Sequence, residues 1–519
     1  MIGRLGDGRH HIATITKDRF LGFLIWQSFP STLVYLLCKT LLAPLAPATT
    51  LVAAVSAFLF FQLSLLLFST SLFVVSSPQP VRGVSPIELL LGLLKLIFVY
   101  GGQPLPSDFR RRARVSLSFI LFIASSGVSA FLSVVCLSGS EVFGALGLRG
   151  LAVGLIYGSH YVFTRRWVLD FPIVQRPLFF SYKMGIRKAI VKALKLSTPA
   201  YLLSLPLHIF VNDQKSLGDI IINQIVFYLS CAVIFLCWEL NRHLLQVFLT
   251  KRYQFAPPKG SAAAEMNPSD HLLAAFEDTT PRSLVRFLAY LDLCMVSESN
   301  VDTWRRAAFF EETGDTYKKV IAVSLKPLEH LTLDLTERLQ SSPENSFHLS
   351  HQLSTSHEPF YDFQVCAWCA CIASALTVRS HKEDRFGVAQ LSGSNAATLS
   401  TLLAALLAVE TLMGKKTNLQ SSNQNLTNIK WAALSPTRRD TTTTISNKKD
   451  GSYYSKAYSM ADILRNCIYQ IVSNFHHEMV VSSKAGLLEK DWIVSGKPLY
   501  GSREILVQKL RMFLEFQAN

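Results

Sequence analysis

Two kinds of hydrophobic pattern divide the chain near residue 260. The first half contains six long apolar runs, whereas in the second half apolar residues recur every three or four positions. A helix needs roughly twenty apolar residues to cross about 30 Å of hydrocarbon, so the first pattern predicts membrane spans. The second pattern predicts helices that bury one face against a protein core. The predicted spans are residues 20–42, 50–75, 115–137, 142–163, 196–211 and 220–240.

Two apolar runs differ from the rest. Residues 196–211 form a short run that contains two prolines, so we expect a kinked or partly re-entrant helix there. Residues 87–100 form a further run with one glutamate and one lysine. Were this run to cross the membrane, every later basic loop would lie on the wrong side. We therefore expect a helix in the cytoplasmic interface or a re-entrant helix.

Basic residues mark one side of the predicted membrane. The loops at 43–49, 138–145 and 212–219 hold one basic residue, Lys215, whereas the alternate loops hold six and eight. Lysine and arginine are retained on the cytoplasmic side, so this alternation predicts that both termini lie there. The most basic stretches either contact anionic lipid headgroups or only set the orientation. Their candidate membrane-surface residues are Arg110, Arg111, Arg112, Arg114, Lys183, Arg187, Lys188 and Lys192.

The distribution of charge restricts the class of partner. The 519 residues carry a formal net charge of +15. Up to residue 260 there are 25 lysines and arginines against 9 acidic residues (+16), and beyond it 26 against 27 (−1). A nucleic-acid-binding protein is expected to carry its basic patch on an aqueous domain. The distribution therefore indicates membrane topology, and we expect no direct contact with nucleic acid.

These patterns predict an all-α fold in two parts, a six-span transmembrane domain followed by a mainly helical aqueous domain. The last span is expected to continue as a helix through 243–248, as a stiff connection to the aqueous domain. The polar stretch 414–452 has no apolar period and is expected to be a disordered insertion. The other expected segments are a cytoplasmic N-terminus (1–19), the transmembrane domain with its basic loops (20–249), a linker (250–280) and the aqueous domain (281–413 and 453–519).

The aqueous half begins with an apolar helical face that is either protein core or a partner surface. Thr280 can cap this helix with Pro281 at its first position, and Asp302 can cap the next. The later apolar segments 360–378 and 396–413 are expected to form a buried helical pair, because the basic connection between them would otherwise lie in the lumen. The residues of the apolar face are Leu284, Phe287, Leu288, Leu291 and Trp304.

Cysteines and histidines occur in the chain, but not at the spacing of a metal site or a catalytic site. The run CAWCAC at 366–371 lies in an apolar helical segment with no second ligand pair, so we expect core packing. His348, His351 and His357 fall in a polar stretch without an evident fourth ligand. The sequence has no phosphate-binding loop, nucleophile elbow or zinc-protease motif. We expect no catalytic residue, no metal and no cofactor, and therefore not an enzyme.

Ionisable residues inside the predicted spans keep a second function class open. Lys39, Arg149, His160 and Glu239 lie mostly near segment ends, from which long side chains can reach the surface. No two of them form an obvious relay at helical spacing. The alternative function is therefore a multi-pass endomembrane transporter or a lipid-handling enzyme.

One segment of the aqueous half resembles a known family. The stretch PRSLVRFLAYLDLCMVSESNVDTWRRAAFFE at 281–311, behind six spans, resembles the Ndc-type (nuclear division cycle) transmembrane nucleoporins, in particular their plant branch. The six-span half resembles the family in architecture, and residues 255–339 resemble it in amino-acid sequence. The later stretch ADILRNCIYQIVSNFHHEMV resembles it more loosely. The family has no catalytic motif to carry over.

The resemblance implies a membrane anchor of the nuclear pore complex. Such a protein holds the pore scaffold in the pore membrane of the nuclear envelope, which is continuous with the endoplasmic reticulum. It supports pore assembly, and through it nucleocytoplasmic transport of protein and mRNA. The implied partners are inner-ring linker nucleoporins, the aladin-type propeller protein and membrane lipids, with self-association as a further expectation.

Overall fold

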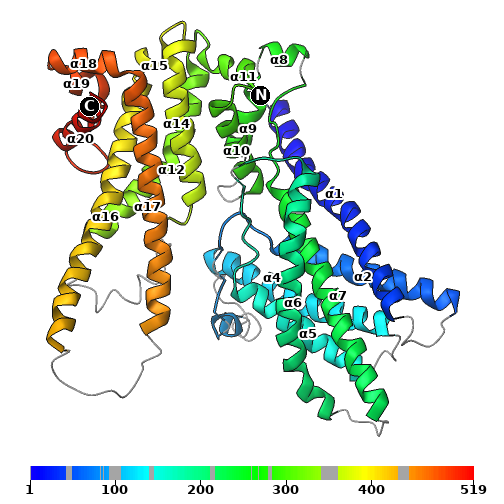
Figure 1. Ribbon diagram of the computed structural model, residues 1–519. Helices are drawn as coiled ribbons and strands as arrows, with labels where there is room; N and C mark the ends of the chain where they lie inside the picture. The colour runs from blue at the N-terminus through cyan, green and yellow to red at the C-terminus, as the bar shows by residue number, and fades with distance from the viewer. Residues whose placement is uncertain are drawn as a thin grey trace, which may run out of the picture. The chain divides into compact units, whose positions relative to one another are not determined.

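The protein is all-α and divides into two compact units. The computed structural model describes residues 2–42, 50–81, 83–85, 87–92, 107–138, 145–172, 174–210, 217–258, 260–266, 268–278, 283–340, 360–430 and 443–518 (Figure 1). Over these ranges the β-type pairing is an isolated bridge between Ser77 and Val168. The first unit holds Met1–Arg252 with Arg282–Leu284, and the second holds Tyr253–Pro281 with Val285–Asn519.

Each predicted span falls on one long helix of the first unit. Thr50 lies at the N-cap of the second of these helices and accepts a hydrogen bond from the Ala53 N–H, as expected where an apolar run begins after a polar residue. The six helices are α1 (Ile2–Leu42), α2 (Leu51–Val75), α4 (Ser107–Ser138), α5 (Ala145–Phe163), α6 (Leu178–Phe210) and α7 (Leu217–Thr250).

Helices that can cross a membrane occur in both units. Within the described residues, six are long and apolar enough: those containing Thr14–Leu41, Leu51–Val75, Phe109–Ser138 and Ile220–Thr250, and in the second unit Phe363–Glu383 and Ser394–Gly414. In the first unit only 22 to 44% of each apolar stretch is buried by protein, which leaves the remainder for lipid. In the second unit 56% and 67% are buried, which favours a protein core. The chain is therefore a multi-pass membrane protein.

Helix α7 is the hub of the first unit. It packs against each of the other five long helices, which also contact one another in the chain order α1, α2, α4, α5, α6. Its Trp238 is fully buried and stacks on Phe68 of α2, with ring centroids 4.4 Å apart. As the sequence predicts, α7 continues past the apolar run to Thr250.

Small residues bring α4 and α5 close together. Gly150, Gly154 and Gly158 recur every four positions on α5, so they lie on one face. A Cβ atom at Gly154 would collide with the backbone carbonyl oxygen of Ser126 and would lie 2.7 Å from the Cβ atom of Ala130. Close backbone approach through small residues is a common mode of helix packing in membranes.

Helix α6 is longer than the apolar run at 196–211, for which a kinked or partly re-entrant helix was expected. It is one unbroken helix of 33 residues that contains both Pro199 and Pro206. A proline removes only one N–H donor, and the helical segment that precedes Pro199 already supplies several turns from which the helix can propagate.

The run at 87–100 begins as a helix at residue 87. Ser85 and Glu88 form a reciprocal cap, in which the Glu88 N–H donates to the Ser85 hydroxyl at 3.2 Å and the Ser85 N–H donates to the Glu88 carboxylate at 3.4 Å. Residues 93–106 lie outside the described residues, so the choice between an interfacial and a re-entrant helix stays open.

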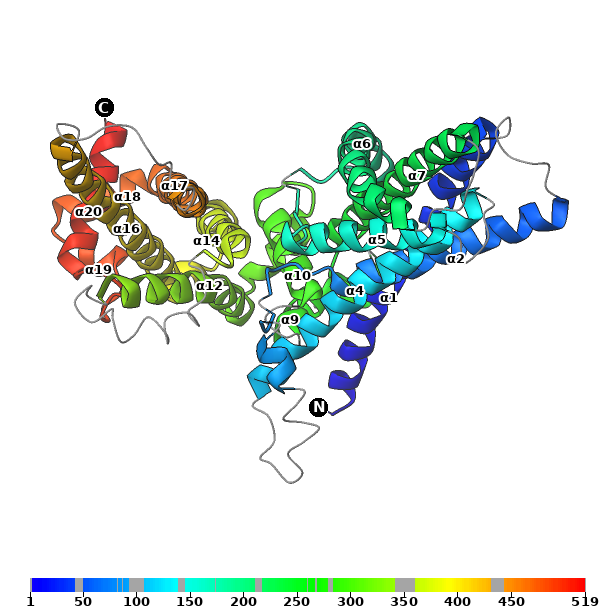
Figure 2. The same cartoon turned by 90° about the horizontal axis from the view of Figure 1, so that it is seen from below.

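The second unit is built around four long helices. Helix α12 contacts α14, α14 contacts α17, α17 contacts α16 and α16 contacts α12, so the four close a ring around one core (Figure 2). The helices of this unit are α8 (Ala262–Met266), α9 (Asp270–Asp278), α10 (Leu284–Glu298), α11 (Thr303–Ala307), the 3₁₀ turn η2 (Ala308–Phe310), α12 (Asp315–Gln340), α14 (Phe363–Glu383), α15 (Val388–Leu391), α16 (Ser394–Lys430), α17 (Thr443–Asn474), α18 (His476–Lys484), α19 (Leu488–Trp492) and α20 (Arg503–Ala518).

The predicted apolar residues of α10, with Trp304 of α11, are largely protein core. Phe287, Leu288 and Leu291 are buried, whereas Leu284 and Trp304 are half-buried. The predicted cap at Thr280 and Pro281 lies outside the described residues. Asp302 occupies the N-cap position of α11, but its side chain makes no capping hydrogen bond.

Two expectations for the second unit need correction. The apolar helices α14 and α16 are buried as predicted, but each packs chiefly against α12 and α17 and only slightly against the other. The stretch 414–452, expected to be disordered, is helical over 414–430 and 443–452, and residues 431–442 lie outside the described residues. Helix propagation is far less costly than nucleation, so an established helix can continue into a polar sequence.

Candidate functional site: a basic pocket formed by α5, α6 and α7

A turn after α5 places two arginines at the edge of a pocket. The Arg166 N–H donates to the Tyr161 carbonyl at 3.2 Å and the Arg165 N–H donates to the Val162 carbonyl at 3.1 Å, which is the hydrogen-bond pattern of a Schellman cap. Arg165 has φ of 52°, the left-handed region that usually selects glycine at this position. An L-residue there costs roughly 1–2 kcal/mol. The sequence thus keeps a charged side chain where glycine would be less strained.

Arg166 is held by a buried carboxylate of α7. Its Nη2 atom donates to both oxygens of Glu239, at 2.7 Å to Oε1. The Nε atom of Arg242 also donates to Glu239, at 3.3 Å, as does the hydroxyl of Tyr157, at 3.1 Å. The side chain of Arg166 is only 7% exposed, and its Nε and Nη1 atoms have no hydrogen-bond partner among the described residues. Two donor atoms of this buried cation are therefore left without an acceptor among the described residues.

One wall of the pocket is the close contact between α6 and α7. The His243 Nε2 atom lies 3.2 Å from the carbonyl oxygen of Ser181 and 3.1 Å from that of Tyr182, so it donates to these acceptors. The ring also stacks on Tyr182. A Cβ atom at Gly185 would collide with the His243 imidazole, so only glycine permits this approach without displacement.

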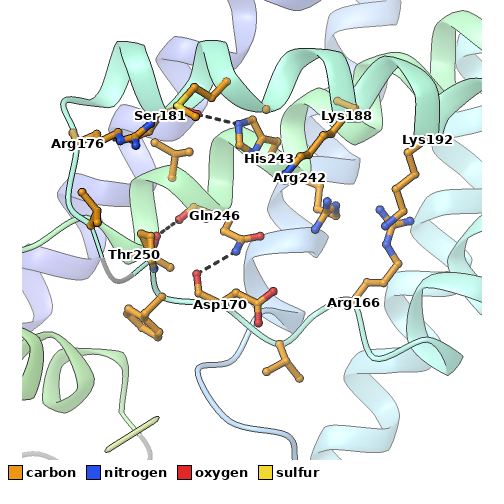
Figure 3. Close-up of a pocket in the computed structure, with 18 of the residues that line it drawn as sticks. Arg166, Asp170, Arg176, Ser181, Lys188, Lys192, Arg242, His243, Gln246 and Thr250 are labelled. Atoms are coloured by element: carbon orange, nitrogen blue, oxygen red, sulfur yellow. Dashed lines mark hydrogen bonds between the residues drawn. The ribbon is translucent and has the colours of Figure 1, made fainter. Parts of the chain in front are cut away.

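The floor of the pocket is the segment between α5 and α6. The Gln246 side chain donates to the Asp170 carbonyl at 3.0 Å, and the Thr250 hydroxyl donates to the Gln246 carbonyl at 2.7 Å (Figure 3). The Ser77 N–H donates to the Trp167 carbonyl at 3.1 Å, which fixes the same segment from the side of α2. These backbone contacts fix the floor without using its charged side chains.

The resulting pocket is open, has a volume of about 950 Å³ and is strongly basic. In Figure 3, Arg176 lies at one end, Arg166 and Lys192 at the other, and Lys188 and Arg242 between them. The carboxylate among the lining side chains belongs to Asp170. Six cationic side chains line the pocket: Arg165, Arg166, Arg176, Lys188, Lys192 and Arg242.

The structure gathers only two of the predicted membrane-surface residues into this pocket. Lys188 and Lys192 line it, and Arg187 joins them in a smaller open hollow of about 590 Å³ along α6. Lys183 is exposed on α6 outside both hollows. On α4, Arg110, Arg111 and Arg114 are exposed and Arg112 is half-buried.

Sequence reasoning missed the other four cations of the pocket. In the charge pattern these four arginines contributed only to the predicted topology: Arg165, Arg166 and Arg176 in a basic loop, and Arg242 in the basic tail after the last span. The feature that distinguishes this site is an arginine at a left-handed turn position, followed by a second arginine. The backbone angle φ is known only from the structure, so the sequence did not reveal it. The glycine spacing on α5 was readable and was also missed.

Two ionisable residues in the spans correct a further expectation, since they do not reach the surface. Arg149 is 1% exposed and Glu239 is fully buried. Arg149 donates to the Gln224 side chain at 3.1 Å, and its guanidinium lies over the Phe227 ring, 4.0 Å from the centroid. Lys39 donates to the Leu137 carbonyl at 3.2 Å. Side chains and carbonyl groups of neighbouring helices therefore contact Arg149 and Lys39 within the unit.

Most cysteines of the second unit lie in its protein core. Cys366 and Cys369 of α14 are 3% and 0% exposed, which confirms the prediction of core packing for these two, whereas Cys371 is half-buried. In the part of the chain that the structure describes, no group of three or more His, Cys, Asp or Glu side chains is arranged to hold a metal ion. The histidines His348, His351 and His357 lie outside that part.

The second unit carries an apolar groove between α16, α17 and α20. Its volume is about 480 Å³, and Tyr469, Met512 and Phe516 among its lining residues are 41%, 57% and 75% exposed. At its edge, Glu410 of α16 binds both Arg465, at 2.9 Å, and Lys509, at 2.8 Å.

No protein-family model and no curated protein matches this chain.

Proposed function

We propose that this protein is a transmembrane nucleoporin that anchors the nuclear pore scaffold in the pore membrane and supports pore assembly. One observation carries the proposal, the resemblance of residues 281–311 to the Ndc-type family. In the structure Arg305 and Arg306 of that segment are buried and paired with Asp292 and Glu383. The residues that carry the resemblance are thus also residues that hold the second unit together.

The connection between the units supports an anchoring role. Helix α7 contacts all the other long helices of the first unit and ends at Thr250, and the second unit begins at Tyr253. Arg19 of α1 donates to the carbonyls of Phe248 and Leu249, at 2.7 and 2.9 Å. Along the chain, the hub helix therefore leads directly into the second unit.

The groove on the second unit supports a protein partner. We assign it to an apolar segment of another nucleoporin, with inner-ring linker nucleoporins and the aladin-type propeller protein as the expected sources. Exposed Met512 and Phe516 would be covered, and the charges around Glu410 would border the contact. The variant Phe516→Glu should lose neighbours in proximity labelling from the C-terminus. Val481→Glu, at a 55% exposed residue of α18 outside the groove, is the matched control.

Localisation gives the direct test of the proposed function. A fluorescent fusion of the full chain should be enriched at the nuclear rim, and its labelled neighbours should be pore components. Uniform endoplasmic reticulum fluorescence, with no pore component among the neighbours, would refute the proposal.

A transporter or lipid-handling enzyme is the second candidate, favoured by the buried charges of Arg149 and Glu239. For an anchor, Arg149→Leu should leave rim enrichment and neighbours unchanged. Loss of cellular function with Arg149→Leu, together with full function of Phe516→Glu, would favour the second candidate.

A further inference from the structure

The lining of the basic pocket carries more cations than carboxylates. Six cations line it against one lining carboxylate, and Glu239 behind it pairs with Arg166 and Arg242. Like charges that share one cavity repel, and this repulsion is relieved when an anion enters.

The strained turn provides a second, independent observation. Arg165 stands at a left-handed position where glycine would fit without strain, and its side chain lines the pocket. Strained backbone conformations concentrate at ligand-binding sites, where the structure around them holds the residue in place. The arginine side chain at this position is thus maintained at a cost to the fold.

The surroundings of the pocket distinguish a lipid from a soluble anion. Val174 and Met184 line the pocket and are 63% and 60% exposed. Next to them, Phe179 and Phe180 of α6 are 62% and 57% exposed. A mouth that combines cations with exposed apolar side chains matches a molecule whose charged headgroup continues into acyl chains.

We propose that this pocket binds the phosphate-bearing headgroup of an anionic membrane lipid, with Arg165 and Lys188 as its main contacts. The headgroup enters between α6 and the turn after α5, while the acyl chains lie along the exposed apolar side chains of α6. The site fixes one lipid at the end of the hub helix. It does not depend on the proposed role at the nuclear pore.

The experiment measures lipid retention by the full-length protein in detergent, using native mass spectrometry. The probes are phosphatidic acid and phosphatidylinositol phosphate, with phosphatidylcholine as the neutral comparison. Both anionic lipids should be retained and phosphatidylcholine lost. Lys188→Gln should weaken retention about fivefold, which corresponds to one surface charge against a headgroup.

Two further variants distinguish lipid binding in the pocket from nonspecific electrostatic attraction of anionic lipid to the protein. Arg165→Gly should weaken retention while raising the melting temperature, because it removes the charge and the backbone strain together. Lys183→Gln removes the same charge from the same helix outside the pocket and should retain lipid as the wild type does. Equal retention by Lys188→Gln, Arg165→Gly and Lys183→Gln would overturn the proposal.

A competition arm identifies the source of the phosphate. Inorganic phosphate and a soluble inositol phosphate should displace the lipid only weakly, because neither gains the apolar contacts of the mouth. If either soluble anion displaces the lipid at an equal concentration, the pocket serves a soluble phosphate and the lipid assignment is wrong.

Discussion

Arg305 and Asp292 form a buried two-point ion pair inside the second unit. The Nη1 and Nη2 atoms of Arg305 donate to the two carboxylate oxygens of Asp292, at 3.2 and 2.7 Å. The same carboxylate accepts from the Phe255 N–H at 3.0 Å, and Arg305 donates to the Phe255 carbonyl at 3.2 Å. The pair therefore joins α10 and α11 to the first residues of the unit.

Removing one partner of this pair should be strongly destabilising. The two side chains are 3% and 0% exposed, so Asp292→Ala leaves a buried guanidinium without its counterion. Loss of a buried pair in this way typically costs 3–5 kcal/mol. Thermal unfolding of the full chain in detergent should show a large drop in the melting temperature of the second unit.

The control for this change is an exposed ion pair of the same kind. Asp462 and Arg465 are 70% and 44% exposed, and Asp462→Ala should change stability by about 0–1 kcal/mol. Equal melting temperatures for Asp292→Ala and Asp462→Ala would show that the buried pair contributes no more to stability than the exposed pair.

Gly154→Ala should destabilise the first unit although alanine is the better helix former. The new methyl group meets the Ser126 carbonyl oxygen and the Ala130 side chain, so α4 and α5 must move apart. We expect a loss of about 1–3 kcal/mol, the usual cost of overpacking. Gly218→Ala, on α7 with no atom within 4 Å of the new Cβ, should gain up to about 1 kcal/mol from helix propensity. The same sign of change in both variants would contradict the close contact.

Arg19→Ala should loosen the end of α7. The guanidinium donates to the carbonyls of Phe248, Leu249 and Lys251, the last at 2.6 Å, where the helix leaves carbonyl groups unsatisfied. Hydrogen exchange of the amides across residues 247–252 should become faster, with a loss of roughly 1–2 kcal/mol. Lys17→Ala, at an exposed position two residues earlier on α1, should leave these amides unchanged.

The second unit should lose stability in alkali. Burial raises the pKa of Tyr317 above its ordinary value of about 10, so the folded state keeps a proton that the unfolded state releases. The stabilisation is complete below pH of about 10 and is lost as the pH rises beyond it. Tyr317→Phe should flatten the fall of the melting temperature in this range. Tyr458→Phe, at a 55% exposed tyrosine, should not, and equal slopes in both variants would contradict the assignment.

The apolar pattern was sufficient to predict the long elements because local physics decides them. A run such as 220–240 is too long and too apolar for anything except a buried or membrane helix, and α7 covers it. Phe287, Leu288 and Leu291 were likewise recognisable as one apolar face, and they are buried. The same pattern could not exclude their use as a partner surface, because burial depends on which helices cover that face.

The pocket could not be predicted, because it needs partners from distant positions. Glu239 meets Arg166, which lies 73 residues earlier in the chain, and no local period connects them. Arg165 differs from the other arginines of its loop in its φ of 52°, which the sequence does not reveal. The length of α6 was not predicted either, since the helix begins well before the apolar run and continues through Pro199 and Pro206.

The sequence by itself determined that this chain is helical, crosses a membrane and changes character near residue 260, because hydrophobic length and period act locally along the chain. Tertiary structure alone decided which charges are buried and which share a cavity. Burial and electrostatic pairing depend on distances between helices, and those distances are set by contacts such as Gly154 against Ser126 and Gly185 against His243.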